Sequence, residues 1–296
     1  MPISCMTISS GSCARRGPDP AILDRVTKNR TVKFFCVIFV LALFGCSREA
    51  REVLRVPVAP QPVEYDHNHT VLGNVLEGVV DFGLVDYDQL LRRRVALEGY
   101  LLASARVPRP QFDQWQKAER MAFLLNIYNA TTLKLLADHY PLKSIKDIST
   151  FPSVWKLKVV RLFGDKYSLD DLEHGMIREQ FKSPQIHFAL VCGARSCPPL
   201  RKEPYTAPRL ETQFREQAQV FLRDAERNRV DLETRIIHLS PLFKWYAEDF
   251  GQTEEDLRRF IAPHLSAEDR LSLEGGGFRI EYTDYDWTLN RQPVQK

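Results

Sequence analysis

The sequence predicts an α+β fold: a single domain in which a long buried helix packs on a small mixed or antiparallel sheet, with several flanking helices. Three observations predict it. Apolar residues recur at helical spacing in several segments, only a few short segments have strand character, and no internal repeat is present. The chain has 296 residues, 44% of them hydrophobic, which is enough to bury a sizeable core.

Helical periodicity and capping signals place the helices along the chain. The long helix ends just before Pro141, and Ser168 with Asp171 three residues later forms a capping pattern. Pro241 follows the capping residue Ser240, at the first helical position where proline is favoured. We therefore expect helices over 85–104, 112–139, 168–181, 208–228 and 241–250, and from 253 onward.

Strand character is confined to short segments in the second half of the chain. Residues 186–191 form a short, almost wholly apolar run, which is typical of a buried strand. The other expected strands are 154–163, which is followed by a turn at Gly164, then 234–240, and the start of 278–290.

The N-terminal region indicates export and lipid anchoring. Basic residues precede the apolar run 34–44, which is shorter than the roughly 20 residues of a membrane span and resembles a signal peptide. The run leads into LFGC, and Cys46 there resembles the lipidated cysteine of bacterial lipoproteins; an uncleaved anchor is the alternative. Because Ser47 rather than aspartate follows, we expect a bacterial envelope protein at the outer membrane, facing the periplasm.

These features divide the chain into a signal segment (1–45), a tether (46–69) and a globular domain (70–296). The tether is charged and then Pro-rich. His67 and His69 lie in it, and such a pair in a linker is mostly solvated, so we expect no metal and no other cofactor. The net charge of +3, with scattered basic residues, argues against a nucleic-acid partner.

Two asparagines interrupt the apolar surface of the long helix. Apolar residues run nearly all the way round residues 121–130, so this part of the helix is expected to be buried. An unsatisfied buried amide costs about 1–3 kcal/mol, so Asn126 and Asn129 need partners. Either they hydrogen-bond a neighbouring backbone segment, or they line a pocket and hold a substrate or a catalytic histidine.

His187 is the residue on which a functional site would centre. In a strand it would share one face with Ala189 and Val191, in an apolar layer. A buried histidine is usually neutral and hydrogen-bonded, and Glu173 on the preceding helix is a candidate to orient it. Glu173 and His174 point about 100° apart on a helix, so one of them is expected to face outward; a solvated pair is the alternative.

The turn CGARSCPP follows, with Gly193 permitting a tight bend. Cys192 and Cys197 admit four interpretations: a disulfide, favoured by an oxidising envelope; a catalytic thiol activated by His187; a zinc site with unusual spacing; or free structural thiols. Ser196 is a further candidate nucleophile.

Six blocks in order carry a family resemblance: FLLNIYNATTLKLL, YPLKSIKDI, SLDDLEHGMIR, IHFALVCGARSCPPLR, LSPLFKWYAEDF and YTDYDWTLN. Together they resemble the domain-of-unknown-function 547 family over about 85–290. The resemblance implies one α+β domain, often secreted or lipid-anchored in bacteria, and no assigned reaction. The layout is also similar to that of papain and transglutaminase, where a helix-borne cysteine meets a strand-borne histidine; here the helix offers Asn126 and Asn129 instead.

We therefore predict an uncharacterised lipid-anchored envelope protein with a hydrolase-like or acyl-transfer-like pocket around His187. The alternative is a non-catalytic envelope protein that uses the same pocket for binding or assembly. Expected partners are the membrane, through the lipid on Cys46, and an unidentified envelope ligand or protein. The catalytic candidates are His187, Glu173, Asn126, Cys197 and Ser196, and the binding candidates are Asn129, His174, Arg195, Trp245 and Asp249.

Overall fold

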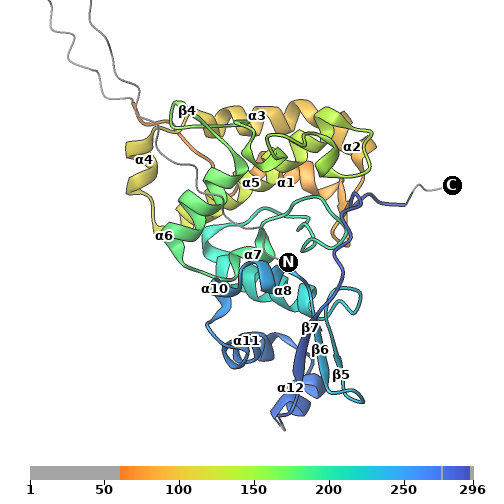
Figure 1. The fold of residues 1–296 in the computed structure, drawn as a ribbon. Coiled ribbons are helices and arrows are strands. Elements are labelled where there is room, and N and C mark those ends of the chain that lie inside the picture. Colours follow the sequence, from red (N-terminus) through yellow and green to blue (C-terminus); the bar gives the residue numbers. More distant parts are fainter. Residues whose placement is uncertain (1–60, 275, 294–296) are drawn as a thin grey trace, which may run out of the picture. The chain divides into compact units, whose positions relative to one another are not determined.

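The computed structural model describes residues 61–274 and 276–293. Helices dominate, and the strands form small sheets of two or three strands, which confirms the α+β prediction (Figure 1). The signal segment 1–45 and Cys46 lie outside the described residues. Among the described helices, none combines the length and the apolar character needed to cross a bilayer.

The first part of the domain is helical, with two small hairpins. Its helices are α1 (Thr70–Glu77), α2 (Tyr87–Arg92), α3 (Arg94–Ala105), α4 (Arg109–Gln114) and α5 (Lys117–His139), followed by the 3-10 turns η1 (Ile145–Asp147) and η2 (Val154–Lys156). The antiparallel hairpins pair β1 (Val80–Asp81) with β2 (Leu84–Val85) and β3 (Val160–Leu162) with β4 (Asp165–Tyr167).

The second part combines short helices with a three-stranded sheet. The helices are η3 (Asp171–Arg178), α6 (Glu179–Phe181), α7 (Ile186–Ala189), η4 (Ala207–Arg209), α8 (Leu210–Leu222), α9 (Leu242–Trp245), α10 (Ala247–Phe250), α11 (Glu254–Ile261), η5 (Ala262–His264) and α12 (Ala267–Glu274). The strands are β5 (Arg229–Asp231), β6 (Ile236–Leu239) and β7 (Arg279–Tyr282); β6 lies between β5, to which it is antiparallel, and β7, to which it is parallel.

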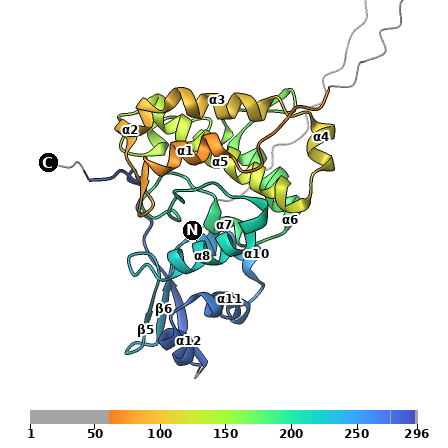
Figure 2. The same cartoon turned by 180° about the vertical axis from the view of Figure 1, so that it is seen from behind.

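The long helix α5 is buried along most of its length, as its apolar periodicity predicts. Its main packing partners are α3, η3 and η4, whereas the mixed sheet belongs to a second core cluster with Phe221 and Phe243. The long helix and the antiparallel strand β3 share the first core cluster, whereas the mixed sheet β5–β7 packs in the second. In both views α3 lies at one end of the domain and β5–β7 at the opposite end, with α7 and α8 between them (Figures 1 and 2).

Residues 186–191 do not form the predicted strand. Ile186–Ala189 form the helical turn α7, and extended backbone begins at Leu190. All four residues of the turn are at most 3% exposed, so the run carries no periodicity that could separate a helix from a strand. Pro184 begins the turn by accepting the N–H of His187 at 3.2 Å.

Residues 154–163 form only a partial strand. Val154–Lys156 is a 3-10 turn, in which the N–H of Lys156 donates to the carbonyl of Ser153 at 2.8 Å. Pairing begins at Val160 in β3. Local hydrogen bonding at the start of the segment thus competes successfully with the strand.

The globular domain begins before residue 70, so the predicted tether is too long. Tyr65 packs against Trp115, with ring centroids 5.3 Å apart. His69 is 2% exposed, and its Nδ1 hydrogen-bonds the Tyr100 hydroxyl at 2.9 Å. Burial lowers the pKa of His69 to about 4, so this histidine is neutral at pH 7 and contributes to the core.

Candidate active site

Asn129 on α5 fixes the backbone segment that leads to Cys192. Its Nδ2 donates to the carbonyl of Ala189 at 2.9 Å, and its Oδ1 accepts the N–H of Val191 at 3.0 Å. One buried amide therefore satisfies two backbone groups that no strand partner satisfies. Asn129 positions the backbone immediately before Cys192.

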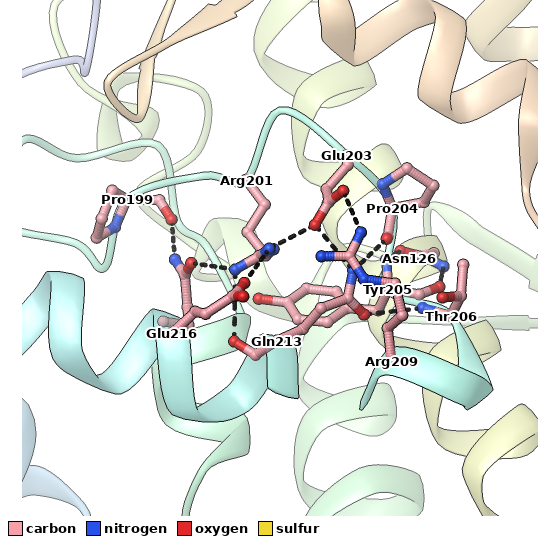
Figure 3. A network of polar contacts seen from close by, with 11 residues as sticks. Asn126, Pro199, Arg201, Glu203, Pro204, Tyr205, Thr206, Arg209, Gln213 and Glu216 are labelled. Atoms are coloured by element: carbon pink, nitrogen blue, oxygen red, sulfur yellow. Dashed lines mark hydrogen bonds and ion pairs between the residues drawn. The ribbon is translucent and has the colours of Figure 1, made fainter. Parts of the chain in front are cut away.

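Asn126 holds a different backbone segment, at Tyr205, in the same way. Its amide exchanges two hydrogen bonds with the backbone of Tyr205, at 2.8 and 2.9 Å (Figure 3). The clamped segment is also held by Arg201, which forms ion pairs with Glu203 and Glu216 (Figure 3). Both ends of the Asn126 amide are thus used by the backbone, so Asn126 does not orient His187 and is not a catalytic residue.

Gly193 forms the tight bend that the sequence predicts. Its φ is +77°, a conformation that favours glycine. A Cβ atom at this position would lie 2.4 Å from Cδ1 of Leu136 on α5. The turn therefore requires glycine both for its conformation and for its close approach to the long helix.

Cys192 and Cys197 are both free thiols, so the predicted disulfide is not formed in this structure. The N–H of Cys192 donates to Sγ of Cys197 at 2.9 Å, and Sγ of Cys192 lies 3.3 Å from the Tyr285 hydroxyl. Hydrogen bonds from Cys197, the Tyr285 hydroxyl and the Ala194 N–H lower the pKa of the Cys192 thiol. Burial raises the pKa of Cys197, which therefore remains a thiol.

His187 is 3% exposed and is bound by Asp249 rather than by Glu173. Its Nε2 lies 2.5 Å from Oδ2 of Asp249, which also receives a bidentate contact from Arg178 at 2.7 and 2.9 Å. Burial lowers the pKa of His187, so the ring is neutral at pH 7. The pKa of Asp249 lies below its usual range because hydrogen bonds from Arg178 and His187 outweigh its own desolvation.

Glu173 and His174 separate as consecutive helical positions predict: Glu173 is buried and His174 is exposed. Glu173 accepts the hydroxyls of Tyr246 at 2.5 Å and Tyr128 at 3.0 Å. The helix η3 is a π-helix, whose hydrogen bonds join residues five apart. This geometry places Glu173 and Arg178 on the same side, so that both reach the site.

Tyr246 contacts both His187 and Glu173. Its ring stacks on His187 with centroids 3.9 Å apart, while its hydroxyl donates to Glu173. His187, Glu173, Tyr246 and both cysteines line one cavity of about 230 Å³. Among the described residues, no hydrogen bond joins His187 directly to Glu173, Asn126 or either cysteine. The histidine and the thiols thus share the cavity without a direct hydrogen bond between them.

Two predicted site residues lie elsewhere. Ser196 and Arg195 line a different cavity, and Oγ of Ser196 accepts the N–H of Asp286 at 2.9 Å. The predicted binding residues His174 and Trp245 line the cavity of His187, Trp245 with half of its surface exposed. Within residues 61–274 and 276–293, no three or more His, Cys, Asp or Glu side chains are placed to share a metal ion.

The sequence did not indicate Arg178, Tyr128, Tyr246 or Tyr285 as site residues. A signal existed for Tyr128, because a hydroxyl in a helix buried on most faces needs a polar partner. No such local signal marks Tyr246 or Tyr285, whose partners are 73 and 93 residues away in the sequence.

Comparison with known proteins gives a family for the part of the chain that carries the histidine and the cysteines. Residues 112–222 match the family model described as "Protein of unknown function, DUF547". No curated protein and no solved structure matches the chain. Tyr246, Asp249 and Tyr285 lie beyond the matched residues. The segment from the long helix to α8, which contains His187, Cys192 and Cys197, is thus the part of the chain that is similar to the DUF547 family.

Proposed function

We propose that this protein is a thiol-dependent acyl-transfer enzyme or hydrolase, in which Cys192 is the nucleophile and His187 is the acid–base group. The observation that carries the proposal is that both side chains line the same cavity, one with a lowered thiol pKa and the other bound to a carboxylate. A nucleophile, a base and a group that orients the base form the general pattern of such sites.

Cys192 is a better nucleophile than the two residues that the sequence suggested. The thiolate is the reactive form of cysteine, and the donors around Cys192 favour it. Cys197 is 5% exposed and keeps its proton, and Ser196 does not line the cavity of His187. Cys197 instead supports Cys192 by accepting its backbone N–H.

The contact with Asp249 fixes which nitrogen of His187 is basic. An ionised carboxylate only accepts hydrogen bonds, so Nε2 carries the proton and donates to Oδ2. The other nitrogen, Nδ1, then carries the free lone pair. Arg178 holds Asp249 through two parallel hydrogen bonds and keeps the carboxylate in place.

The reaction follows from these roles. The Cys192 thiol gives its proton to Nδ1 of His187, through water in the cavity. The sulfur then forms a bond to the acyl carbon, the bond from that carbon to the leaving group breaks, and the imidazolium returns the proton to the leaving group. A water or another acceptor next gives a proton to His187, attacks the thioester and releases the Cys192 thiolate, which regains the proton from His187.

A test is the capture of the acyl-enzyme with an activated ester such as p-nitrophenyl acetate. Peptide mass spectrometry is expected to find acetyl on Cys192, and Cys192→Ser should lose at least about 10³-fold in p-nitrophenol release. Cys197→Ser is the matched control and should retain the acyl-enzyme. Wild-type turnover by Cys192→Ser, or acetylation at Ser196 alone, would contradict the role of Cys192. Absence of both acyl-enzyme and turnover in the wild type would favour the non-catalytic alternative.

We also propose that the domain is held at the bacterial envelope by a lipid on Cys46. The apolar run 34–44 and the LFGC sequence support this placement. Cells fed a labelled fatty acid should incorporate it into the wild-type protein and not into Cys46→Ser, with Cys36→Ser as the control. Equal incorporation in both variants would rule out lipidation at Cys46.

A further inference from the structure

The cavity of His187 has an unusual balance of charge. Among the described residues, those that line it include the carboxylates of Asp170 and Glu173 but no lysine or arginine. His187 adds no positive charge at pH 7, because burial lowers its pKa. Carboxylates thus outnumber lysine and arginine side chains in the lining of the cavity, and Lys146 and Arg178 lie beyond that lining.

Of the two carboxylates in the lining, that of Glu173 is buried, with only 6% of the residue exposed. Both of its oxygens accept hydrogen bonds from tyrosine hydroxyls, of Tyr128 and of Tyr246. In the part of the chain that the structure describes, no lysine, arginine or histidine lies within ion-pair distance of Glu173. Buried charges are ordinarily paired, so a carboxylate in this position favours a cationic ligand.

Much of the remaining lining is aromatic. Tyr285, Trp245 and Trp287 contact one another, with centroid distances of 4.8 Å for Trp245–Tyr285, 4.5 Å for Tyr285–Trp287 and 5.9 Å for Trp245–Trp287. Trp155 is 5.8 Å from Trp287. Aromatic faces attract cations, most strongly where water is excluded. Lys146 demonstrates this at the edge of the cluster, where its Nζ lies 3.4 Å from the centroid of Trp287.

We propose that this cavity binds a quaternary or alkylated ammonium group, with Glu173 as its counter-charge and the aromatic side chains as its walls. The volume of about 230 Å³ is below the roughly 300–1,000 Å³ of pockets for drug-sized ligands, which suits a small head group. As a statement of substrate class, the inference rests on the proposed function: the ammonium group would place an attached acyl carbon between Cys192 and His187.

Tryptophan fluorescence gives a direct measurement, because three of the four tryptophans line the cavity. Titration of the full chain with choline is expected to change the emission in a saturable way. The neutral isostere 3,3-dimethyl-1-butanol should bind about 10-fold or more weakly. Glu173→Gln should weaken choline binding by a similar factor, whereas Glu179→Gln, an exposed acid on α6, should leave it unchanged.

Two further variants distinguish loss of ammonium binding from loss of folding and from loss of turnover. Trp245→Leu changes a half-exposed residue and should weaken choline binding about 5-fold even if Glu173→Gln does not fold. Cys192→Ser should bind choline as the wild type does, so that loss of turnover and loss of binding are distinguishable. Equal binding of the neutral isostere, or saturable binding of N-acetylglucosamine that Glu173→Gln leaves intact, would overturn the ammonium assignment.

Discussion

Replacing Asn129 with alanine is expected to lower the free energy of unfolding by roughly 2–5 kcal/mol, because the carbonyl of Ala189 and the N–H of Val191 both lose a buried partner. The same change frees the backbone that positions Cys192. A displacement of about 1 Å at a reacting group can cost about 10²-fold in rate, so we expect ester turnover to fall by about that factor. Denaturant unfolding and p-nitrophenol release measure the two effects.

Asn126→Ala is the matched control. It removes the same two hydrogen bonds from the same helix, but at Tyr205 rather than beside the cysteine. It should lose a similar free energy of unfolding while keeping turnover within a few-fold of the wild type, under conditions where both proteins are folded. If the two variants lose turnover equally, Asn129 acts through global stability and does not position the site.

Replacing Asp249 with asparagine is expected to reduce turnover by about 10³–10⁴-fold with little change in shape. An asparagine can donate its Nδ2 hydrogen to Nε2 of His187, which moves the ring proton to Nδ1 and removes the basic lone pair. Loss of the orienting carboxylate costs about 10⁴-fold in hydrolytic triads for this reason. Glu248→Gln is the control, since it removes a neighbouring exposed carboxylate and should leave the rate unchanged.

The pH dependence gives an independent check on the role of His187. A base must be neutral to accept a proton, and burial lowers the pKa of His187 from its ordinary value of 6.5. In the wild type, kcat/KM is expected to fall on the acid side with a midpoint below pH 6.5. An acid limb that is unchanged in Asp249→Asn, together with a wild-type rate, would exclude His187 as the acid–base group.

Much of the helical architecture follows from local signals. Pro141 stands beyond the end of α5 and the helix carries a continuous apolar surface, so its end and its burial were both predictable. The predicted start at residue 112 was wrong, because residues 109–114 form the separate helix α4 and α5 begins at Lys117. The strand predicted over 186–191 failed because four consecutive residues are buried on all sides. Periodicity disappears when every face is covered, and only the neighbouring elements decide between helix and strand.

Within the site, too, some features could be predicted from the sequence and others could not. Local patterns alone predict that Asn126 and Asn129 need partners, that Glu173 and His174 point about 100° apart, and that Gly193 permits a tight bend. These conclusions rest on the cost of burying an unpaired polar group and on local backbone geometry.

Long-range packing, by contrast, is what makes Asp249 rather than Glu173 the partner of His187, and what places both cysteines but not Ser196 in its cavity. The residues in contact are far apart in the chain: Asp249 lies 62 positions from His187, and Tyr285 lies 93 from Cys192. Such pairings depend on how helices pack, which is set by the whole core rather than by any local pattern.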